Sequence, residues 1–291
     1  MIPETRSNSV FYSAKWRETC PKAYGSVTGI LDGYGVPHAA LSGTRDIWVR
    51  DFMPIQVSPA RFERYHYMPD YLREDKRYAR LISDPLEVCR ANGIRADDGL
   101  GGICIDGGNV VHGGRKVIMT AKVFEENPKT TVFDLARLLE MHFGARLIIL
   151  PWDTKEMFGH ADGIVRFVDD DTVIMTNYRQ FDPRMADRFR SILQAQFKTV
   201  HELHYDVEDL SSHSWAYINW LQTDKVLILP SFGIPEDEQA FRQIERWMPE
   251  YRGRIEMADA TDLIRGGGCF NCATWTVCTP TDSQRLIGTG P

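Results

Sequence analysis

The stretch "GGGCFNCATW" (266–275) holds the residues whose types and spacing point most directly to chemistry, a C-x-x-C pair formed by Cys269 and Cys272. Such a pair can bind zinc, cycle between thiols and a disulfide, or supply one nucleophilic thiol. A structural zinc site needs four ligands, and the chain has no second C-x-x-C. A redox pair is expected at the start of a helix, whereas β-prone residues follow here. The sequence therefore favours one nucleophile, which needs activation because a free thiol titrates near about 8.5.

A second pair of chemically useful residues lies in "FGHADGIVRF" (158–167). In an extended segment, His160 and Asp162 point to the same face because side chains alternate along a strand. An imidazole beside a carboxylate is a common arrangement for general acid–base catalysis. The alternative interpretation is a surface turn, since Gly159 and Gly163 flank the pair.

Two further stretches carry polar residues in apolar surroundings. Asp51 lies in "WVRDFMP" (48–54), where it either forms an ion pair with Arg45 or Arg50 or awaits a cationic ligand. The glycines of "IDGGNVV" (105–111) allow a ligand to approach the backbone closely. A phosphate site is not indicated there, because the chain lacks a G-x-G-x-x-G or a Walker lysine at the required spacing.

The elements that must position these residues repeat along the chain. Three segments share a polar start, a β-branched apolar run and a final Thr or Pro: 114–123, 170–179 and 223–232. Strand-like stretches precede them (109–113, 163–169 and 215–221) and helical patterns follow (131–143, 183–197 and 235–248), with further short strands such as 145–150. The ranges 48–57 and 269–278 fit the same first-strand position. Five units with a period of about 55 residues predict a closed, propeller-like α/β fold.

The candidate residues fall at equivalent points, near the start of the first strand of each unit. They are Trp48, Arg50 and Asp51; Asp106 and Asn109; His160 and Asp162; Ser214 and Asn219; and the stretch 269–278. In a closed array these positions would converge on one central pocket. The alternative is an ordinary α/β sheet, whose buried strands resemble one another without any repeat.

Composition limits the classes of partner. The chain has 291 residues, of which 43% are hydrophobic and 25% charged, and a formal net charge of −6. This charge disfavours a nucleic-acid partner, which binds basic surfaces, and is compatible with a small cationic substrate. The N-terminal stretch 1–16 lacks the apolar core of a secretory signal, and the apolar runs are too short to span a bilayer. We expect a soluble, cytoplasmic protein without a membrane partner, and six cysteines suggest no disulfide framework.

Five motifs in order and spacing resemble those of the agmatine deiminase and bacterial peptidylarginine deiminase family. They are "WVRDFMP", "DGGN", "GHADGIVRF", "PSFG" and "GGGCFNC", and they cover nearly the whole chain. The resemblance implies the pentein fold of guanidine-modifying enzymes, a five-bladed α/β propeller around a central active site, as one catalytic domain over 1–291. Homo-oligomers are compatible with this expectation.

The resemblance also implies a role for individual residues. Cys272 resembles the nucleophile and His160 the general acid/base, while Asp51 and Asp162 resemble the pair that grips a guanidinium. Trp48 resembles an aromatic that shapes the site, and Asp106 and Asn219 are expected substrate contacts. Cys269 is expected to be a packing residue. The implied reaction converts a guanidine into a ureido product and ammonia through an amidino-cysteine, without metal or organic cofactor.

The sequence departs from the family pattern at three places, all of which concern the choice of substrate. Asn271 stands where agmatine deiminases usually have His, Asp106 stands where Glu is typical, and "ATWTVC" replaces a glutamine-containing segment. Agmatine, free arginine, a peptidyl arginine and other alkylguanidines therefore all stay open. Two other functions compete: an amidinotransferase with the same Cys/His/Asp set, and a non-catalytic protein whose Cys269–Cys272 pair binds metal or switches redox state.

Overall fold

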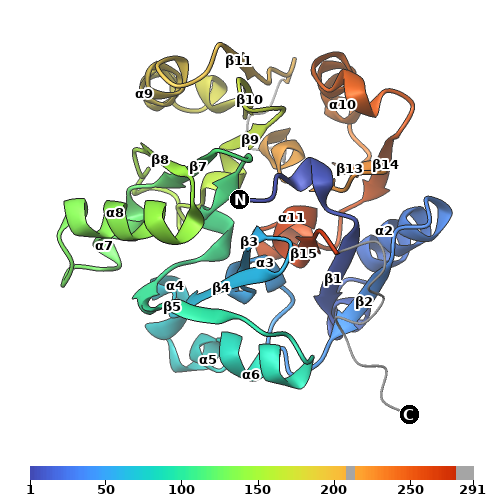
Figure 1. Cartoon of the computed structure of the whole chain (residues 1–291). Helices are drawn as coiled ribbons and strands as arrows, with labels where there is room; N and C mark the ends of the chain where they lie inside the picture. The colour runs from blue at the N-terminus through green and yellow to red at the C-terminus, as the bar shows by residue number, and fades with distance from the viewer. Residues whose placement is uncertain (208–213, 280–291) are drawn as a thin grey trace.

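Five small sheets surround a central axis in the computed structural model, which describes residues 1–207 and 214–279 (Figure 1). Each sheet has three strands built on one plan. The first strand pairs antiparallel with the middle strand, and the middle strand pairs parallel with the third. Because a parallel pair needs a crossover, helical segments separate the middle and third strands.

Four units follow one another along the chain. Their strands are β3 (Ile55–Ser58), β4 (Arg61–His66) and β5 (Asp97–Cys104); β6 (Val111–His112), β7 (Lys116–Thr120) and β8 (Arg146–Leu150); β9 (Val165–Phe167), β10 (Thr172–Met175) and β11 (Thr199–Glu202); and β12 (Leu221–Gln222), β13 (Leu227–Ser231) and β14 (Ile255–Asp259). The crossovers contain α4 (Asp70–Arg73), α5 (Lys76–Ala79) and α6 (Pro85–Ala91); α7 (Lys122–Glu125) and α8 (Val132–Phe143); α9 (Pro183–Gln194); and α10 (Glu236–Trp247). The three predicted helices at 131–143, 183–197 and 235–248 are thus confirmed.

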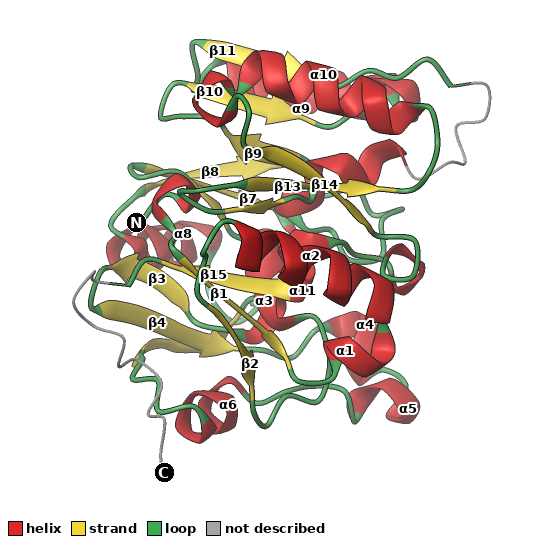
Figure 2. Ribbon diagram, turned by 90° about the vertical axis from the view of Figure 1, so that its right-hand side faces the viewer, coloured by secondary structure: helices red, strands yellow, loops and turns green. Residues whose placement is uncertain are grey.

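The fifth unit joins the two ends of the described chain. Strand β1 (Ser9–Ser13) is its middle strand, between β15 (Thr274–Val277) and β2 (His38–Leu41). The crossover from β1 to β2 contains α1 (Trp16–Thr19) and α2 (Pro21–Gly33) (Figure 2). Buried apolar side chains of α2 and β1 belong to one hydrophobic cluster. This pairing closes the ring, so the predicted five-bladed α/β propeller is confirmed. The sequence had placed 269–278 in the fifth unit but had not identified β1, α2 and β2 as the rest of it.

A short helical turn precedes the first strand of each unit, near the axis. These turns are α3 (Val49–Phe52), three 3-10 turns at Gly107–Asn109, Ala161–Gly163 and Ser214–Ile218, and α11 (Phe270–Ala273). The prediction of continuous strands over 48–57, 215–221 and 269–278 was therefore wrong at their starts, and so was the extended segment at 160–162. The turns contact one another around the axis, and these tertiary contacts override the β propensity of the local sequence.

The outer helices cover the ring with one apolar face each. In α8 the buried residues Leu135, Leu139 and Phe143 recur at every fourth position, and Gly144 ends the helix in the left-handed region at φ 60°. Figure 1 shows α8, α9, α10 and α2 at the periphery. Among the described residues, no helix is both long and apolar enough to cross a membrane.

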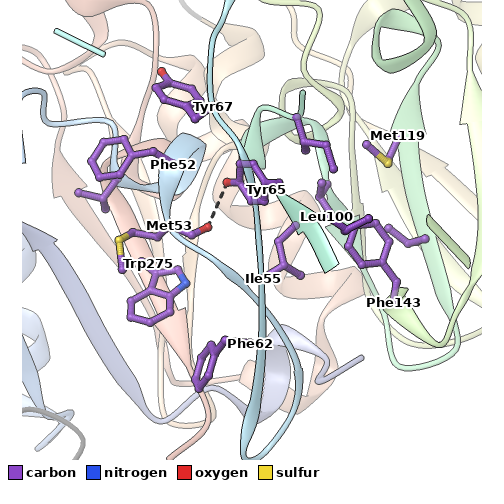
Figure 3. Close-up of a cluster of buried hydrophobic side chains, with 14 of the residues drawn as sticks. Phe52, Met53, Ile55, Phe62, Tyr65, Tyr67, Leu100, Met119, Phe143 and Trp275 are labelled. Atoms are coloured by element: carbon purple, nitrogen blue, oxygen red, sulfur yellow. Dashed lines mark hydrogen bonds between the residues drawn. The ribbon is translucent and has the colours of Figure 1, made fainter. Parts of the chain in front are cut away.

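A buried cluster fixes the first turn against the rest of the ring (Figure 3). Phe62 and Trp275 pack with ring centroids 5.6 Å apart, and Tyr65 belongs to the same cluster. The Tyr65 hydroxyl lies 2.7 Å from the carbonyl oxygen of Asp51 and 3.0 Å from that of Met53. The backbone that carries Asp51 is therefore held from behind by a buried side chain.

Candidate active site

A cavity of about 780 Å³ opens among the helical turns at the axis. Six of the seven predicted site residues line it: Trp48, Asp51, His160, Asp162, Asn219 and Cys272. They come from four of the five units. The equivalence read from the sequence therefore brings them together, although the turns and not the strands carry most of them.

Cys272 points its thiol at a carboxylate. Its Sγ lies 3.3 Å from Asp162 Oδ2, and its backbone N–H donates to Asn219 Oδ1 at 3.2 Å. Burial raises the pKa of the thiol well above its usual value, and the Asp162 and Asp51 carboxylates raise it further. The thiol is thus neutral at neutral pH in the free protein.

His160 lies between two carboxylates. Its Nε2 is 2.9 Å from Asp106 Oδ2, and its Nδ1 is 3.7 Å from Asp51 Oδ1. Burial lowers the pKa of the imidazole, but Asp51, Asp106 and Asp162 outweigh burial and raise it to about 9. His160 is therefore an imidazolium at neutral pH, and its Nε2–H donates to Asp106.

Asp106 has a different place from the predicted one. Its side chain is 1% exposed and does not line the cavity, so it does not meet a substrate directly. The residue precedes the turn at Gly107–Asn109, which directs its carboxylate behind the imidazole of His160. The structure thus places Asp106 behind His160 and not among the residues that line the cavity, where a direct substrate contact was predicted.

Among residues 1–207 and 214–279, no arginine is paired with Asp51. Arg50 donates to the Asn271 carbonyl at 3.3 Å, and Arg45 forms an ion pair with Glu87. One Asp51 oxygen accepts the Gly108 N–H at 3.1 Å. Burial raises the pKa of Asp51, His160 lowers it, and Asp106 and Asp162 raise it, so that it reaches about 7. A cation in the cavity would relieve this repulsion.

Asp162 and Asn219 lie beside Cys272 and are hydrogen-bonded to each other. Asn219 Nδ2 donates to Asp162 Oδ2 at 3.0 Å, while its Oδ1 accepts the N–H groups of Cys269 and Cys272. Asn219 lines the cavity as predicted for a substrate contact, but its amide is already occupied in holding the cysteine turn. Asn271 also donates to Asp162, a contact between residues 109 positions apart that no sequence pattern indicated.

The glycine run lies against the Trp48 indole. A Cβ at Gly266 would lie 2.6 Å from Trp48 Cζ2, and one at Gly268 would lie 2.7 Å from Trp48 Cζ3. Gly267 adopts φ +88°, a left-handed conformation that favours glycine. The three glycines therefore let the backbone before Cys272 pass directly over the aromatic ring.

The other residues singled out in the sequence lie around this centre. Asn109 Oδ1 accepts the Thr120 N–H at 2.8 Å, a structural contact. The Ser214 side chain lies outside the described part of the structure. Cys269 is fully buried in an apolar cluster with Phe270, as expected for a packing residue, whereas Cys272 faces the cavity. All six cysteines are free, and no group of three or more metal-ligating side chains occurs among the described residues.

Gly108→Ala is expected to lower kcat/KM by roughly 100-fold, because a misplacement of about 1 Å at a reacting group has this effect. The added Cβ would lie 2.6 Å from His160 Nδ1 and 2.7 Å from Asp51 Oδ1, so both must move. The matched control is Gly102→Ala, where the Cβ meets nothing within 4 Å. Steady-state kinetics and thermal melts of both variants would check this. Equal activity of the two would show that the spacing of His160 and Asp51 is not critical.

The walls of the cavity were not predictable from sequence. Aromatic residues Tyr67, Tyr71, Phe158 and Tyr178 line it, and so do Asp46, Asp153, Lys155, Glu156 and Asp182. They come from crossover segments, from the loop after β8 and, for Asp46, from the link between β2 and α3, none of which has a repeat signal.

The fold and the site together define a pentein, a five-bladed α/β propeller with a cysteine, a histidine and carboxylates at its centre. The family model of the Porphyromonas-type peptidyl-arginine deiminases matches residues 22–277, and the chain belongs to this family. The resemblance seen in the sequence is thereby confirmed.

Related proteins support this assignment. The chain is similar to the agmatine deiminase of Ectopseudomonas mendocina (strain ymp), with 22% identity over 283 residues covering 79% of this chain and 74% of that protein. The solved C. jejuni agmatine deiminase superposes with a TM-score of 0.71 at 16% identity, covering 94% of both chains. A cysteine-to-serine form of the C. jejuni enzyme with substrate bound gives a TM-score of 0.70 at 16% identity, covering 94% of this chain and 95% of that one.

Proposed function

We propose that the protein is a hydrolase that deiminates a guanidinium substrate to a ureido product and ammonia. The observation that carries the proposal is the meeting of the Cys272 thiol, the His160 imidazolium and the Asp51 and Asp162 carboxylates around one cavity. Membership of a deiminase family and the likeness to agmatine deiminases support it.

A cationic substrate would favour the thiolate form of Cys272. A guanidinium is planar and cationic, and its edge N–H groups match carboxylate oxygens such as those of Asp51 and Asp162. The same two carboxylates raise the pKa of Cys272. A bound guanidinium compensates them, so the thiolate forms next to the carbon that it attacks.

Two half-reactions follow from this arrangement. Cys272 loses its proton to solvent as the substrate binds, and its thiolate adds to the guanidinium carbon. The His160 imidazolium protonates the departing nitrogen, which leaves as ammonia and gives an amidino-cysteine. The now neutral imidazole takes a proton from water, whose oxygen adds to the same carbon. The C–S bond then breaks, and the proton of the added hydroxyl group passes to the sulfur, which releases the ureido product and restores the thiol.

The outer wall of the cavity favours a substrate with a cationic tail. It carries the carboxylates of Asp46, Asp153, Glu156 and Asp182 and one lysine, Lys155, which pairs with Asp182 at 3.2 Å. No arginine lines the cavity in the described part of the chain. An amine-ended guanidine such as agmatine is therefore preferred to free arginine, whose carboxylate would meet like charge.

A guanidine panel tests this proposal. Agmatine, arginine and an arginine-containing peptide are each incubated with the protein, and ammonia and ureido product are quantified. Equimolar ammonia and ureido product, formed fastest from agmatine, is the expected result. Transfer that requires an added amine and releases little ammonia would indicate an amidinotransferase. Inactivity throughout, with zinc found by elemental analysis, would favour the metal-binding Cys269–Cys272 pair.

The pH profile of kcat/KM is expected to be bell-shaped, with limbs near about 7 and about 9. Asp51 must be ionised to accept a guanidinium, and its raised pKa means that activity falls as the pH drops below about 7. His160 must be protonated to serve the leaving nitrogen, so activity falls above about 9. The Asp51→Asn variant should lose the acidic limb along with most of its activity. A wild-type kcat/KM that does not fall below about pH 7 would contradict this role of Asp51.

A further inference from the structure

Asn271 is anchored on every side within the site. Its side chain is buried, and Nδ2 donates to Asp162 Oδ2 at 2.7 Å. Its backbone N–H donates to the Asn219 carbonyl at 3.1 Å, and its own carbonyl accepts from Arg50 Nε at 3.3 Å. One residue of the fifth unit thereby connects the first, third and fourth units at the axis.

The two oxygens of Asp162 differ because of this contact. Oδ2 accepts from Asn219 at 3.0 Å, from Asn271 at 2.7 Å and from the Cys272 thiol at 3.3 Å. A carboxylate oxygen has about two lone pairs, so Oδ2 is fully used. Oδ1 makes no hydrogen bond with the described residues, and Asp162 lines the cavity. The carboxylate thus presents one free acceptor to a ligand.

We propose that Asn271 is a positioning residue that fixes the plane of Asp162, so that Oδ2 stays on the Cys272 thiol while Oδ1 receives the substrate guanidinium. This inference rests on the proposed function and deepens it. A neutral amide suits the task because it donates at every pH and adds no charge. The charged and titratable groups that face it are Asp162 and Cys272 at its side chain, Arg50 behind its carbonyl, and Asp51 and His160 across the cavity.

Two substitutions test the proposal. Asn271→Ala removes the donor and is expected to lower kcat/KM by roughly 10- to 100-fold, as for a lost hydrogen bond to a charged group.

Asn271→Asp keeps the shape of the side chain but makes its ability to donate a hydrogen bond depend on pH. While the introduced acid is protonated it donates to Asp162, and once ionised it repels Asp162. The ratio of variant to wild-type kcat/KM should therefore be close to one at acidic pH and fall steeply as the pH rises.

The matched control is Asn92→Asp, a buried asparagine whose amide donates to the Ser42 and Val88 carbonyls outside the cavity. It changes the same atoms and shares any loss of thermal stability, but its activity ratio should not change with pH. A constant ratio for Asn271→Asp across the pH range, or wild-type kcat/KM in Asn271→Ala, would overturn the proposal.

A second readout does not depend on turnover. Alkylation of Cys272 is compared for cationic 2-chloroacetamidine and neutral iodoacetamide, with Cys272→Ala to identify the labelled thiol. The carboxylates should make the cationic reagent react faster, and Asn271→Ala should reduce this preference about tenfold or more, in line with a lost charge-assisted bond. An unchanged preference in Asn271→Ala would refute the proposal. A protein that shows the preference but deiminates no guanidine would refute the proposed function alone.

Discussion

Cys272→Ala is expected to lower kcat by roughly 10⁴-fold or more, because removal of a catalytic nucleophile leaves only binding and electrostatic contributions to catalysis. The thiol lies in the cavity 3.3 Å from Asp162 Oδ2, and no other cysteine lines that cavity in the described part of the chain. Ammonia release by the purified variant measures the loss. Intact-mass analysis of wild-type protein quenched during turnover should also show an amidino adduct on Cys272.

Cys269→Ala is the matched control for this prediction. Cys269 is three residues away on the same turn, is fully buried in an apolar cluster and does not line the cavity. Its truncation should leave a small void and lower the melting temperature while kcat/KM stays close to the wild-type value. Comparable loss of activity in both variants would mean that the two cysteines act together, as a redox or metal-binding pair would.

His160→Gln is expected to lower kcat by about 10²- to 10⁴-fold, the usual contribution of a positioned general acid or base. The change removes the only imidazole that lines the cavity among the described residues, and with it the proton for the departing nitrogen. It also deletes the limb near pH 9 that His160 gives to the profile. Kinetics across pH with agmatine as substrate would check both effects.

The control for His160 is His201→Gln. His201 stacks on Trp247 with ring centroids 4.6 Å apart, in the outer strand of the third unit. Its loss should affect thermal stability at most. Asp106→Asn adds a graded test, because it keeps a hydrogen-bonding partner for His160 but removes the charge that raises its pKa. A wild-type pH profile in Asp106→Asn would show that Asp106 does not control the protonation of His160.

The parts of the fold that the sequence predicted are those with a strong local period. Strands such as β7, β10 and β13 are continuous buried apolar runs, and α8, α9 and α10 each have an amphipathic face. The N-terminal half of the fifth unit lacked such a signal. Strand β1 finds its partner β15 at the other end of the chain, and Asn8 bonds to Thr279 across 271 positions. A pattern in a short stretch of sequence does not indicate that a strand pairs with a strand so far away along the chain.

The residues that line the centre of the site were predicted, but the backbone conformation that carries them was not. The repeat placed Asp51, His160, Asp162 and Cys272 at equivalent positions, and the structure brings them to one cavity. The short helical turns that carry them were expected as strands. A turn of three to five residues is too short to show the hydrophobic repeat of a helix in its sequence. Here the contacts between the turns determine their conformation. The cavity walls and the Asn271 contact likewise depend on distant segments.

The pairing of β15 with β1 makes the reactive thiol a property of the finished ring. Cys272 lies in the turn that leads into β15, and the partner of β15 in its sheet is β1, which follows the first residues of the chain. The carboxylates and the imidazole come from units that lie between these two strands in the sequence. If Cys272 acts as proposed, activity is expected only after β1 and β15 have paired and closed the ring.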